Sequence, residues 1–313
     1  MSEGESQKTL AEKSLEAQAA LVDRLDLEEL DQDLYRGYNE PLRTGRIFGG
    51  QVAAQSLMAA GRTVDDLLAH SLHGYFLRAG DPEIPIIYTV DRIRDGRSFV
   101  TRRVVAKQRG KAIFNMSCSF HKIEEGPAHQ IQMPDAPEPE SIPSWTERFA
   151  EIGDKLPERI RKVWQPGSRP IDTRELQVPV FLGGEAKGGD NMVWLRTPGP
   201  LPDDPFLHQC VLAYATDFSL IDTMIRQHKE HKHKGRRPAG ASMTASLDHA
   251  IWFHAPLRID DWLLYHQDCP VTFGARGFAR GTIYTRDGRL VASAVQEGLI
   301  RPVAAPDAED RSI

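Results

Sequence analysis

The chain has 313 residues, 40% of them hydrophobic, and a formal net charge of -5. This length suggests about two domains of ordinary size, and 39 Lys and Arg against 44 Asp and Glu lack the basic excess of nucleic-acid-binding proteins. The apolar runs fall short of the about 20 residues that a membrane-spanning helix needs, and the acidic N-terminus lacks the order of a secretory signal. The three cysteines form an odd, sparse set that fits a reducing compartment. We therefore expect a globular intracellular protein with no membrane span and no nucleic-acid partner.

The first half is predicted to contain two helices and four strands. Apolar residues recur at spacings of three to four across 8–35, which predicts a packing helix. A second helix is expected over 51–60, because Gly49-Gly50 permits a tight turn and good helix formers follow. The expected strands, with hairpin turns at Asp95-Gly96 and Arg109-Gly110, lie at 70–77, 84–94, 98–108 and 111–121.

A Pro- and Glu-rich connector over 124–143 and a helical patch over 145–164 precede a second series of elements. Strands are expected at 176–182 and 192–196, and a helix at 204–227, followed by the insertion HKEHKHKGRRPAG. The remaining strands are expected at 244–253, 262–269, 273–285 and 290–301.

The second series repeats the first at a nearly constant offset, which indicates duplicated domains. The matched positions are Tyr88 and Tyr265 at an offset of 177, the turns at 109–111 and 287–289 at 178, and Ser71 and Ser246 at 175. Each half would hold one long helix packed on an antiparallel sheet, an α+β fold.

This organisation predicts three segments. We expect a first domain over 8–123, a linker with a helical patch over 124–173, and a second domain over 174–305 that carries the catalytic residues.

Several common catalytic motifs are missing from the sequence. There is no G-x-S-x-G, no H-E-x-x-H, no Walker A loop and no spaced Cys/His zinc set, which argues against serine-nucleophile and metal-dependent hydrolases. His228, His231 and His233 lie among lysines and are expected to form a solvated loop rather than a metal site. Cys210 and His208 cannot face each other on a helix, so they are a poor nucleophile–base pair. We expect no metal and no cofactor.

Asp217 interrupts the apolar stretch FLHQCVLAYATDFSLIDTMI. It follows Tyr214 by three residues and precedes Ile221 by four, so it points along the apolar face of the expected helix. A carboxylate on a buried face is costly unless it is paired or hydrogen-bonded. Two interpretations stay open: a catalytic carboxylate, and a structural Asp bonded to a neighbouring strand.

Gln296 shares one face of its expected strand with Ala292 and Ala294, which leaves space beside an amide that can donate and accept hydrogen bonds. The repeat aligns Gln296 with Cys118, and Asp217 has no carboxylate counterpart on the first-half helix. Such differences are expected of one active and one degenerate site, although a lone strand Gln is often structural.

Ser246 opens the stretch SLDHAIWFHAP, where its hydroxyl could orient a water molecule or bond the backbone. Asp248 and His249 are neighbours in this stretch, but strand alternation sends them to opposite faces. This disfavours a direct Asp–His pair.

Many ordered segments resemble one family. RIFGGQVAAQSLMAA, HSLHGYFLRAGDP, LAYATDFSL, LDHAIWFHAP and LVASAVQEG, among others from about residue 20 to 302, closely resemble the type II acyl-CoA thioesterases, the TesB-like family. The resemblance implies a double hotdog fold, meaning two tandem hotdog domains, and hydrolysis of fatty acyl-CoA to free fatty acid and coenzyme A. It also implies a homo-oligomer, and we expect a cytoplasmic location.

The resemblance places the family's catalytic Asp, Thr or Ser, and Gln on Asp217, Ser246 and Gln296. We expect these residues to hold one water molecule, with Asp217 as general base. A transient anhydride on Asp217 is the alternative. Backbone amides near Gly50-Gln51 are candidates for stabilising the oxyanion.

The ligand contacts and two other functions stay open. Arginines that could bind the coenzyme A phosphates are Arg78, Arg102, Arg276 and Arg280, although each could equally be solvated or ion-paired. The alternative functions are a non-catalytic acyl-CoA-binding hotdog protein and a hotdog hydratase or dehydratase.

Overall fold

The computed structural model describes residues 8–40, 45–156, 158–228 and 242–302. The first half begins with a helix and a short hairpin, α1 (Leu10–Leu25), β1 (Glu28–Asp31) and β2 (Leu34–Gly37). A central helix and four strands follow: α2 (Gly49–Gly61), β3 (Leu68–Phe76), β4 (Ile86–Asp95), β5 (Phe99–Gln108) and β6 (Lys111–His121).

A connector of short helices leads to the second half. It contains η1 (Pro139–Ser141), α3 (Trp145–Ile152), η2 (Gly153–Lys155) and α4 (Glu158–Trp164). The second half contains β7 (Asp172–Glu175), η3 (Val180–Leu182), β8 (Asn191–Arg196), α5 (Pro205–Thr216), α6 (Leu220–Ile225), β9 (Ser242–Ser246), β10 (Asp248–Phe253), β11 (Leu263–Phe273), β12 (Arg276–Thr285) and β13 (Leu290–Pro302). None of the helices in the described part of the chain is long and apolar enough to span a membrane.

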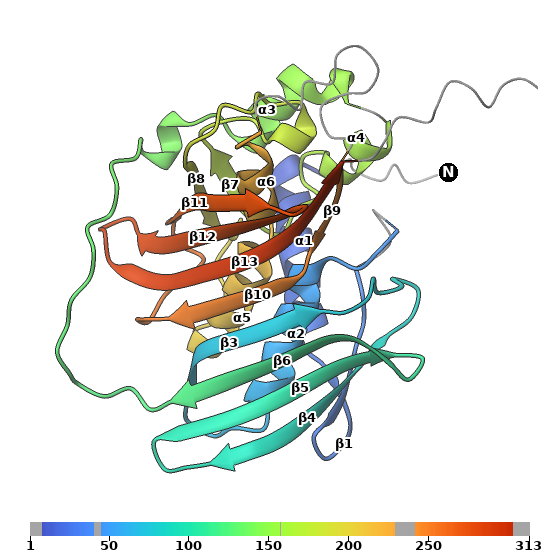
Figure 1. Cartoon of the computed structure of the whole chain (residues 1–313), viewed down its shortest axis with the longest axis vertical. Helices are drawn as coiled ribbons and strands as arrows, with labels where there is room; N and C mark the ends of the chain where they lie inside the picture. The colour runs from blue at the N-terminus through green and yellow to red at the C-terminus, as the bar shows by residue number, and fades with distance from the viewer. Residues whose placement is uncertain (1–7, 41–44, 157, 229–241, 303–313) are drawn as a thin grey trace, which may run out of the picture.

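One antiparallel sheet runs through both halves. Its strand order is β1-β2-β4-β5-β6-β3-β10-β13-β12-β11-β8-β7, and β9 pairs with β13 beside this path. The halves join where β3 pairs with β10, with Leu72 opposite Ile251. Helices α2 and α5 lie side by side against one face of the sheet (Figure 1). The expected α+β fold, with helices packed on an antiparallel sheet, is confirmed.

Helix α2 is thin enough to pack closely against both α5 and the sheet. Ala53, Ala54, Ala59 and Ala60 are completely buried, as are Val211 and Leu212 on α5. Small side chains let helix backbones approach closely, so the buried apolar residues of both halves merge into one core.

Two expected elements are broken where the chain makes special contacts. The helix predicted over 8–35 ends at Leu25 and is followed by the β1–β2 hairpin, whose turn uses Asp33 at a φ of 58°, a conformation that Asp tolerates better than most residues. The helix predicted over 204–227 ends at Thr216 and restarts at Leu220. Between them, the Phe218 ring stacks on Phe48 of the first half at 4.7 Å.

Two expected strands also differ from the prediction. Most of the stretch at 176–182 is a loop that ends in the turn η3, where the backbone N–H of Val180 donates to Asp222 at 2.7 Å. The strand expected over 244–253 is split into β9 and β10 at Leu247.

The split at Leu247 corrects the alignment of the two halves. Strand β3 has an irregularity between Ala69 and Ser71, and the chain shifts register at the equivalent place between β9 and β10. Ala69 pairs with Phe120, as Ser246 pairs with Gly298. Ser246 therefore corresponds to Ala69, at 246 - 69 = 177, and not to Ser71 as the sequence comparison suggested.

Candidate active site

Asp217 lies at the C-terminal end of α5, where the helix stops. Its side chain is 8% exposed. Burial raises the pKa of the Asp217 carboxyl to about 6, although hydrogen bonds from Gln296, Ser246 and the Gly50 backbone act in the opposite direction. The group is therefore a carboxylate at neutral pH, and it becomes protonated at a pH only slightly below neutral.

The structure brings Asp217 together with Ser246 and Gln296. The amide Nε2 of Gln296 donates to Asp217 Oδ1 at 2.8 Å, and Ser246 Oγ donates to the same oxygen at 3.1 Å. Gln296 is completely buried on β13, and Ser246 ends the neighbouring strand β9, opposite Gly298. The two strands thus present both donors to one carboxylate oxygen.

The first half supplies the opposite wall of this site. The N-terminus of α2 lies against Asp217, since a Cβ atom on Gly49 would come within 2.7 Å of Oδ2. A Cβ atom on Gly50 would lie 2.3 Å from the Tyr214 carbonyl oxygen. Gly50 requires glycine because the clash would be with backbone, and the close approach of the helices lets the N-terminus of α2, which favours negative charge, face the carboxylate. The Gly50 N–H expected near an oxyanion thus bonds Asp217 here.

A cavity of about 680 Å³ opens beside Asp217 and Ser246. This volume lies within the usual range of small-molecule sites. Most of its lining is apolar and comes from both halves: Ile47, Phe48, Val52, Phe76, Leu77, Ile113, Phe114, Tyr214, Phe218, Ile221, Ile225, Met243 and Leu247. The arrangement suits a ligand with a long apolar part and a reactive group at the carboxylate.

The basic residues of the cavity differ in part from those expected. Arg78 lines it, together with Arg46 and Arg169, which the sequence did not single out. Arg102 is instead buried in the first half, where it donates to Thr63 at 2.7 Å.

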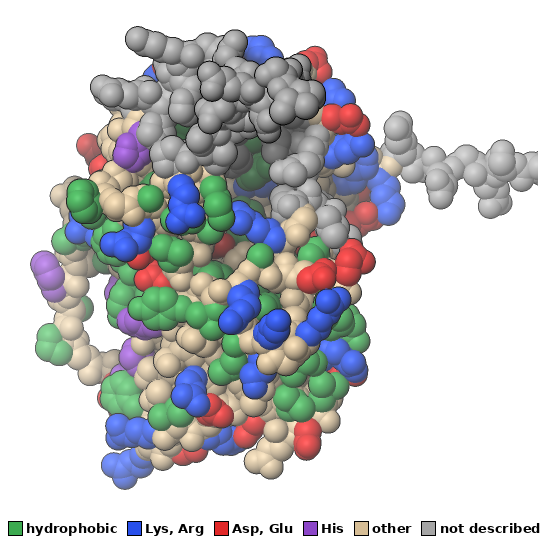
Figure 2. Space-filling model, turned by 45° about the vertical axis from the view of Figure 1, so that its right-hand side comes forward, with side chains coloured by type: hydrophobic (Ala, Val, Ile, Leu, Met, Phe, Trp, Pro, Cys, Tyr) green, Lys and Arg blue, Asp and Glu red, His purple; other side chains and the backbone are tan. Residues whose placement is uncertain are grey.

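The other two candidate arginines lie on the surface of β12. Arg276 and Arg280 form ion pairs with Glu297 and Asp268. The face drawn in Figure 2 carries both basic and acidic side chains.

Comparison with known proteins links this geometry to a family. A family model described as acyl-CoA thioesterase matches residues 160–299, and one described as acyl-CoA thioesterase N-terminal domain matches residues 38–121. Acyl-coenzyme A thioesterase 8 of Mus musculus is 39% identical over 289 residues, which cover 88% of this chain and 87% of that protein. The chain belongs to the type II acyl-CoA thioesterase family. It is a thioester hydrolase that acts on acyl-CoA.

Solved structures agree with this assignment. The crystal structure of acyl-CoA thioesterase II TesB2 from Mycobacterium marinum is 41% identical and has a TM-score of 0.72, over 91% of this chain and 99% of that one. A protein with a hot dog fold from Alicyclobacillus acidocaldarius is 20% identical, with a TM-score of 0.71 over 92% of this chain and 99% of that one. The second likeness shows the fold alone, and together they confirm the double hotdog.

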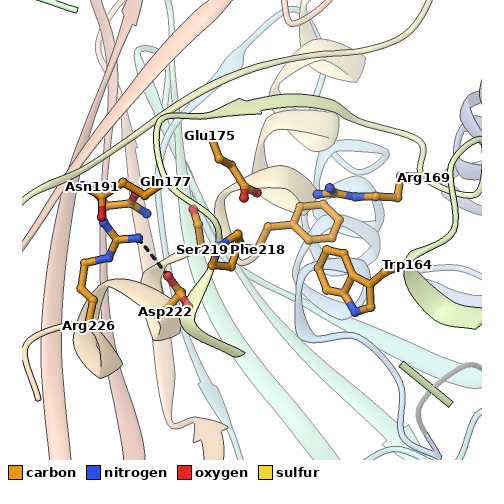
Figure 3. Close-up of a pocket in the computed structure, with 10 residues that line it drawn as sticks. Trp164, Arg169, Glu175, Gln177, Asn191, Phe218, Ser219, Asp222 and Arg226 are labelled. Atoms are coloured by element: carbon orange, nitrogen blue, oxygen red, sulfur yellow. Dashed lines mark hydrogen bonds and ion pairs between the residues drawn. The ribbon is translucent and has the colours of Figure 1, made fainter. Parts of the chain in front are cut away.

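Next to its cavity, the thioesterase holds a buried ionic cluster that the sequence did not predict. Arg226 donates to Asp222 at 3.0 Å, and the Arg169 guanidinium lies over the rings of Trp164 and Phe218 at 4.8 and 5.3 Å. Figure 3 shows the Glu175 carboxylate between Arg169 and Arg226. Burial raises the pKa of Glu175 to about 7. This cluster supports the cavity wall that carries Phe218, directly after Asp217.

Asp248 and His249 face opposite sides of the thioesterase sheet, as alternation predicts. Asp248 Oδ1 accepts from the Glu297 N–H at 2.6 Å, whereas His249 is completely buried and its Nε2 lies 2.9 Å from Thr216 Oγ1. No local sequence signal predicts the Thr216 contact, because it joins residues 33 positions apart on α5 and β10.

Two of the thiols are deeply buried, and most of the histidine-rich insertion lies outside the described residues. Burial raises the pKa of Cys118 to about 12 and that of Cys210 well above its usual value, so both thiols stay protonated. No group of three His, Cys, Asp or Glu side chains suited to a metal occurs in the described ranges. His231 and His233 lie outside the described residues.

Proposed function

We propose that Asp217, Ser246 and Gln296 hold the water molecule that hydrolyses fatty acyl-CoA. The convergence of Gln296 Nε2 and Ser246 Oγ on Asp217 Oδ1, beside the cavity, carries this proposal. A pKa of about 6 suits a general base, since such a carboxylate is ionised at neutral pH yet accepts a proton more readily than an exposed one.

The reaction follows from this arrangement. Asp217 takes a proton from water as the water oxygen bonds to the thioester carbonyl carbon. The carbon–sulfur bond then breaks, and the thiolate of coenzyme A receives the proton from the Asp217 carboxyl. The products are a free fatty acid and coenzyme A, and Asp217 is again ionised.

The cavity supports a fatty acyl substrate. Its largely apolar wall would bury the acyl chain, at about 0.8 kcal/mol per methylene group, while Arg46 and Arg78 would bind phosphates of coenzyme A. A hydratase would need a His paired with a carboxylate, and Asp248 and His249 face apart. Family membership favours hydrolysis over binding alone. The homo-oligomer and the cytoplasmic location stay predictions from the resemblance.

The test compares the parent enzyme with Asp217→Asn, measuring thiol release from acetyl-, octanoyl- and palmitoyl-CoA. Loss of a general base predicts a fall in kcat of about a hundredfold or more. Asp248→Asn is the matched control, because an Asn oxygen can still accept from the Glu297 N–H and turnover should persist. Unchanged turnover in a folded Asp217→Asn variant would contradict the proposed site.

Labelled water separates the general-base route from the anhydride route. In a single turnover in H₂¹⁸O with excess enzyme, general-base catalysis places ¹⁸O in the fatty acid. An anhydride opened at the Asp217 carbonyl would leave the label on the enzyme and give an unlabelled acid.

A further inference from the structure

His249 lies next to Gln296, on the neighbouring strand β10. Strands β10 and β13 pair with Ala250 opposite Val295 and Ile251 opposite Ala294, and one further step along this register places His249 opposite Gln296. In the first half, the equivalent residues, Leu72 and Cys118, are a pair in the sheet. Such partners have Cβ atoms about 4.5–5.5 Å apart and point to the same face.

Two buried polar atoms of this pair lack partners. Among the described residues, neither Gln296 Oε1 nor His249 Nδ1 has a hydrogen-bond partner, and both side chains are completely buried. An unsatisfied buried polar atom costs about 1–3 kcal/mol. A small rotation that joins the two atoms would satisfy both at once.

The orientation of the Gln296 amide decides what it offers Asp217. Only one of the two orientations, related by a 180° flip, directs Nε2 at the carboxylate; the other directs an oxygen at it. A donor on Oε1 would select the productive orientation. Burial lowers the pKa of His249 to about 4, while interaction with Gln296 raises it, so the ring is neutral at neutral pH and carries one proton.

Thr216 can fix where that proton lies. Its hydroxyl lies 2.9 Å from His249 Nε2, and its single proton can be donated either to that nitrogen or to the Ala213 carbonyl oxygen at 3.2 Å. When the hydroxyl donates to Nε2, the imidazole proton is on Nδ1, toward Gln296. Thr216 also directly precedes Asp217, so the end of α5 contacts the β10–β13 pair twice.

We propose that His249 is a positioning residue, whose Nδ1–H holds Gln296 Oε1 so that the amide N–H faces Asp217. This inference rests on the proposed function of Asp217 and Gln296. It adds a second layer, Thr216 and His249, that touches neither the substrate nor the reacting water.

The test uses the difference between the two ring nitrogens. In His249→Asn the side-chain N–H₂ takes roughly the place of Nδ1, whereas in His249→Gln the amide reaches toward the place of Nε2 and Thr216. We expect His249→Asn to keep kcat within a few-fold of the parent on octanoyl-CoA. His249→Gln should lose about tenfold in kcat with KM little changed, the order of one hydrogen bond to a charged group. The acid limb of its kcat–pH profile, meaning the fall in kcat at low pH, should also move to higher pH. The reason is that the misplaced amide no longer donates to Asp217 and so no longer lowers its pKa.

A double-mutant cycle separates positioning from packing. In a Gln296→Ala background, His249→Gln should cause no further loss of kcat, because the amide it orients is gone. His208→Gln is the matched control: it removes an equally buried imidazole, which accepts from the Ile259 N–H at 3.1 Å, far along α5 from Asp217. This control should lower thermal stability and leave the acid limb in place.

Two results would overturn the inference. The first is a His249→Gln enzyme with parental kcat and acid limb; the second is an equal loss in the Gln296→Ala background. If His249 variants fail to fold, Thr216→Val, which keeps the volume of the side chain, must show the same shift of the acid limb. An active Asp217→Asn enzyme would instead refute the proposed function, so the two failures are distinguishable.

Discussion

The helices α2 and α5 run antiparallel and meet at both ends, and the two junctions differ in chemistry. At one end, Asp217 on α5 faces Gly49 at the start of α2. At the other end, Gly61 on α2 faces the start of α5, where a Cβ atom on Gly61 would lie 2.1 Å from the Phe206 ring. The phenyl ring occupies the place where the first junction has a carboxylate.

The first turn of α5, at this second junction, is capped by its own residues. Pro205 has no N–H, and the N–H of Phe206 donates to Asp204 at 2.9 Å. The helix thus satisfies its own first turn, whereas α2 directs an amide at Asp217.

The strands below the junctions differ in the same sense. Ser246 and Gln296 correspond to Ala69 and Cys118, and Gln209 binds both the N–H and the carbonyl oxygen of Ala69 at 3.1 and 2.7 Å. We call the end where Asp217 faces Gly49 the open junction, and the end where Gly61 faces Phe206 the filled junction. One scaffold therefore carries one junction with a carboxylate and one in which a phenyl ring takes its place. The difference lies in a few side chains rather than in the backbone, which predicts one active site per chain.

The largest expected effect comes from replacing two corresponding strand residues, Gln296 and Cys118, by alanine. Gln296→Ala removes a donor that lies 2.8 Å from Asp217 and should lower kcat about a hundredfold, as expected when a fixed polar group is lost from a catalytic site. Cys118→Ala at the filled junction should keep turnover within about twofold and cost about 1 kcal/mol of stability through the small cavity. Steady-state kinetics on octanoyl-CoA and thermal unfolding measure both. An equal loss of kcat in the two variants would end the distinction between the junctions.

The sequence predicted much of this arrangement from local signals. Arg109 and Gly110, expected in a hairpin turn, both have positive φ, and alternation placed Asp248 and His249 on opposite faces. Periodicity marked Asp217, and the repeat marked Gln296. Local signals could not show that α5 stops at Thr216, because Phe218 is held by Phe48 of the other half. They could not predict the Gly49 contact, the Arg46 lining or the His249–Thr216 contact, which arise only when distant segments pack together.

A smaller effect on kcat is expected from pH. The open junction has an ionisable side chain, Asp217, whereas the residue at the corresponding place of the filled junction is Gly61. The raised pKa of Asp217, about 6, means that the base is protonated below that value. The kcat should therefore be constant above neutral pH and fall with a slope of one below about pH 6, to about a tenth at one unit lower. Profiles measured with saturating octanoyl-CoA give the limb. In Glu175→Gln, which removes a carboxyl with a pKa of about 7, the limb should stay in place; its loss would assign the limb to the ionic cluster.

The smallest expected effect separates Ser246 from its counterpart, Ala69. Ser246→Ala removes one hydrogen bond to Asp217 at a partly exposed position, where water can replace the hydroxyl, so kcat should fall only about fivefold, equivalent to about 1 kcal/mol. The acid limb should move to higher pH, because a group that stabilises the carboxylate is lost. Ser246→Thr keeps the hydroxyl and restricts its rotamer, so it should retain parental kcat. Ala69→Ser adds a hydroxyl at the filled junction and should change neither kcat nor the limb, because none of the described residues places a carboxylate there to receive it. A gain or loss of activity in Ala69→Ser would mean that the filled junction takes part in turnover.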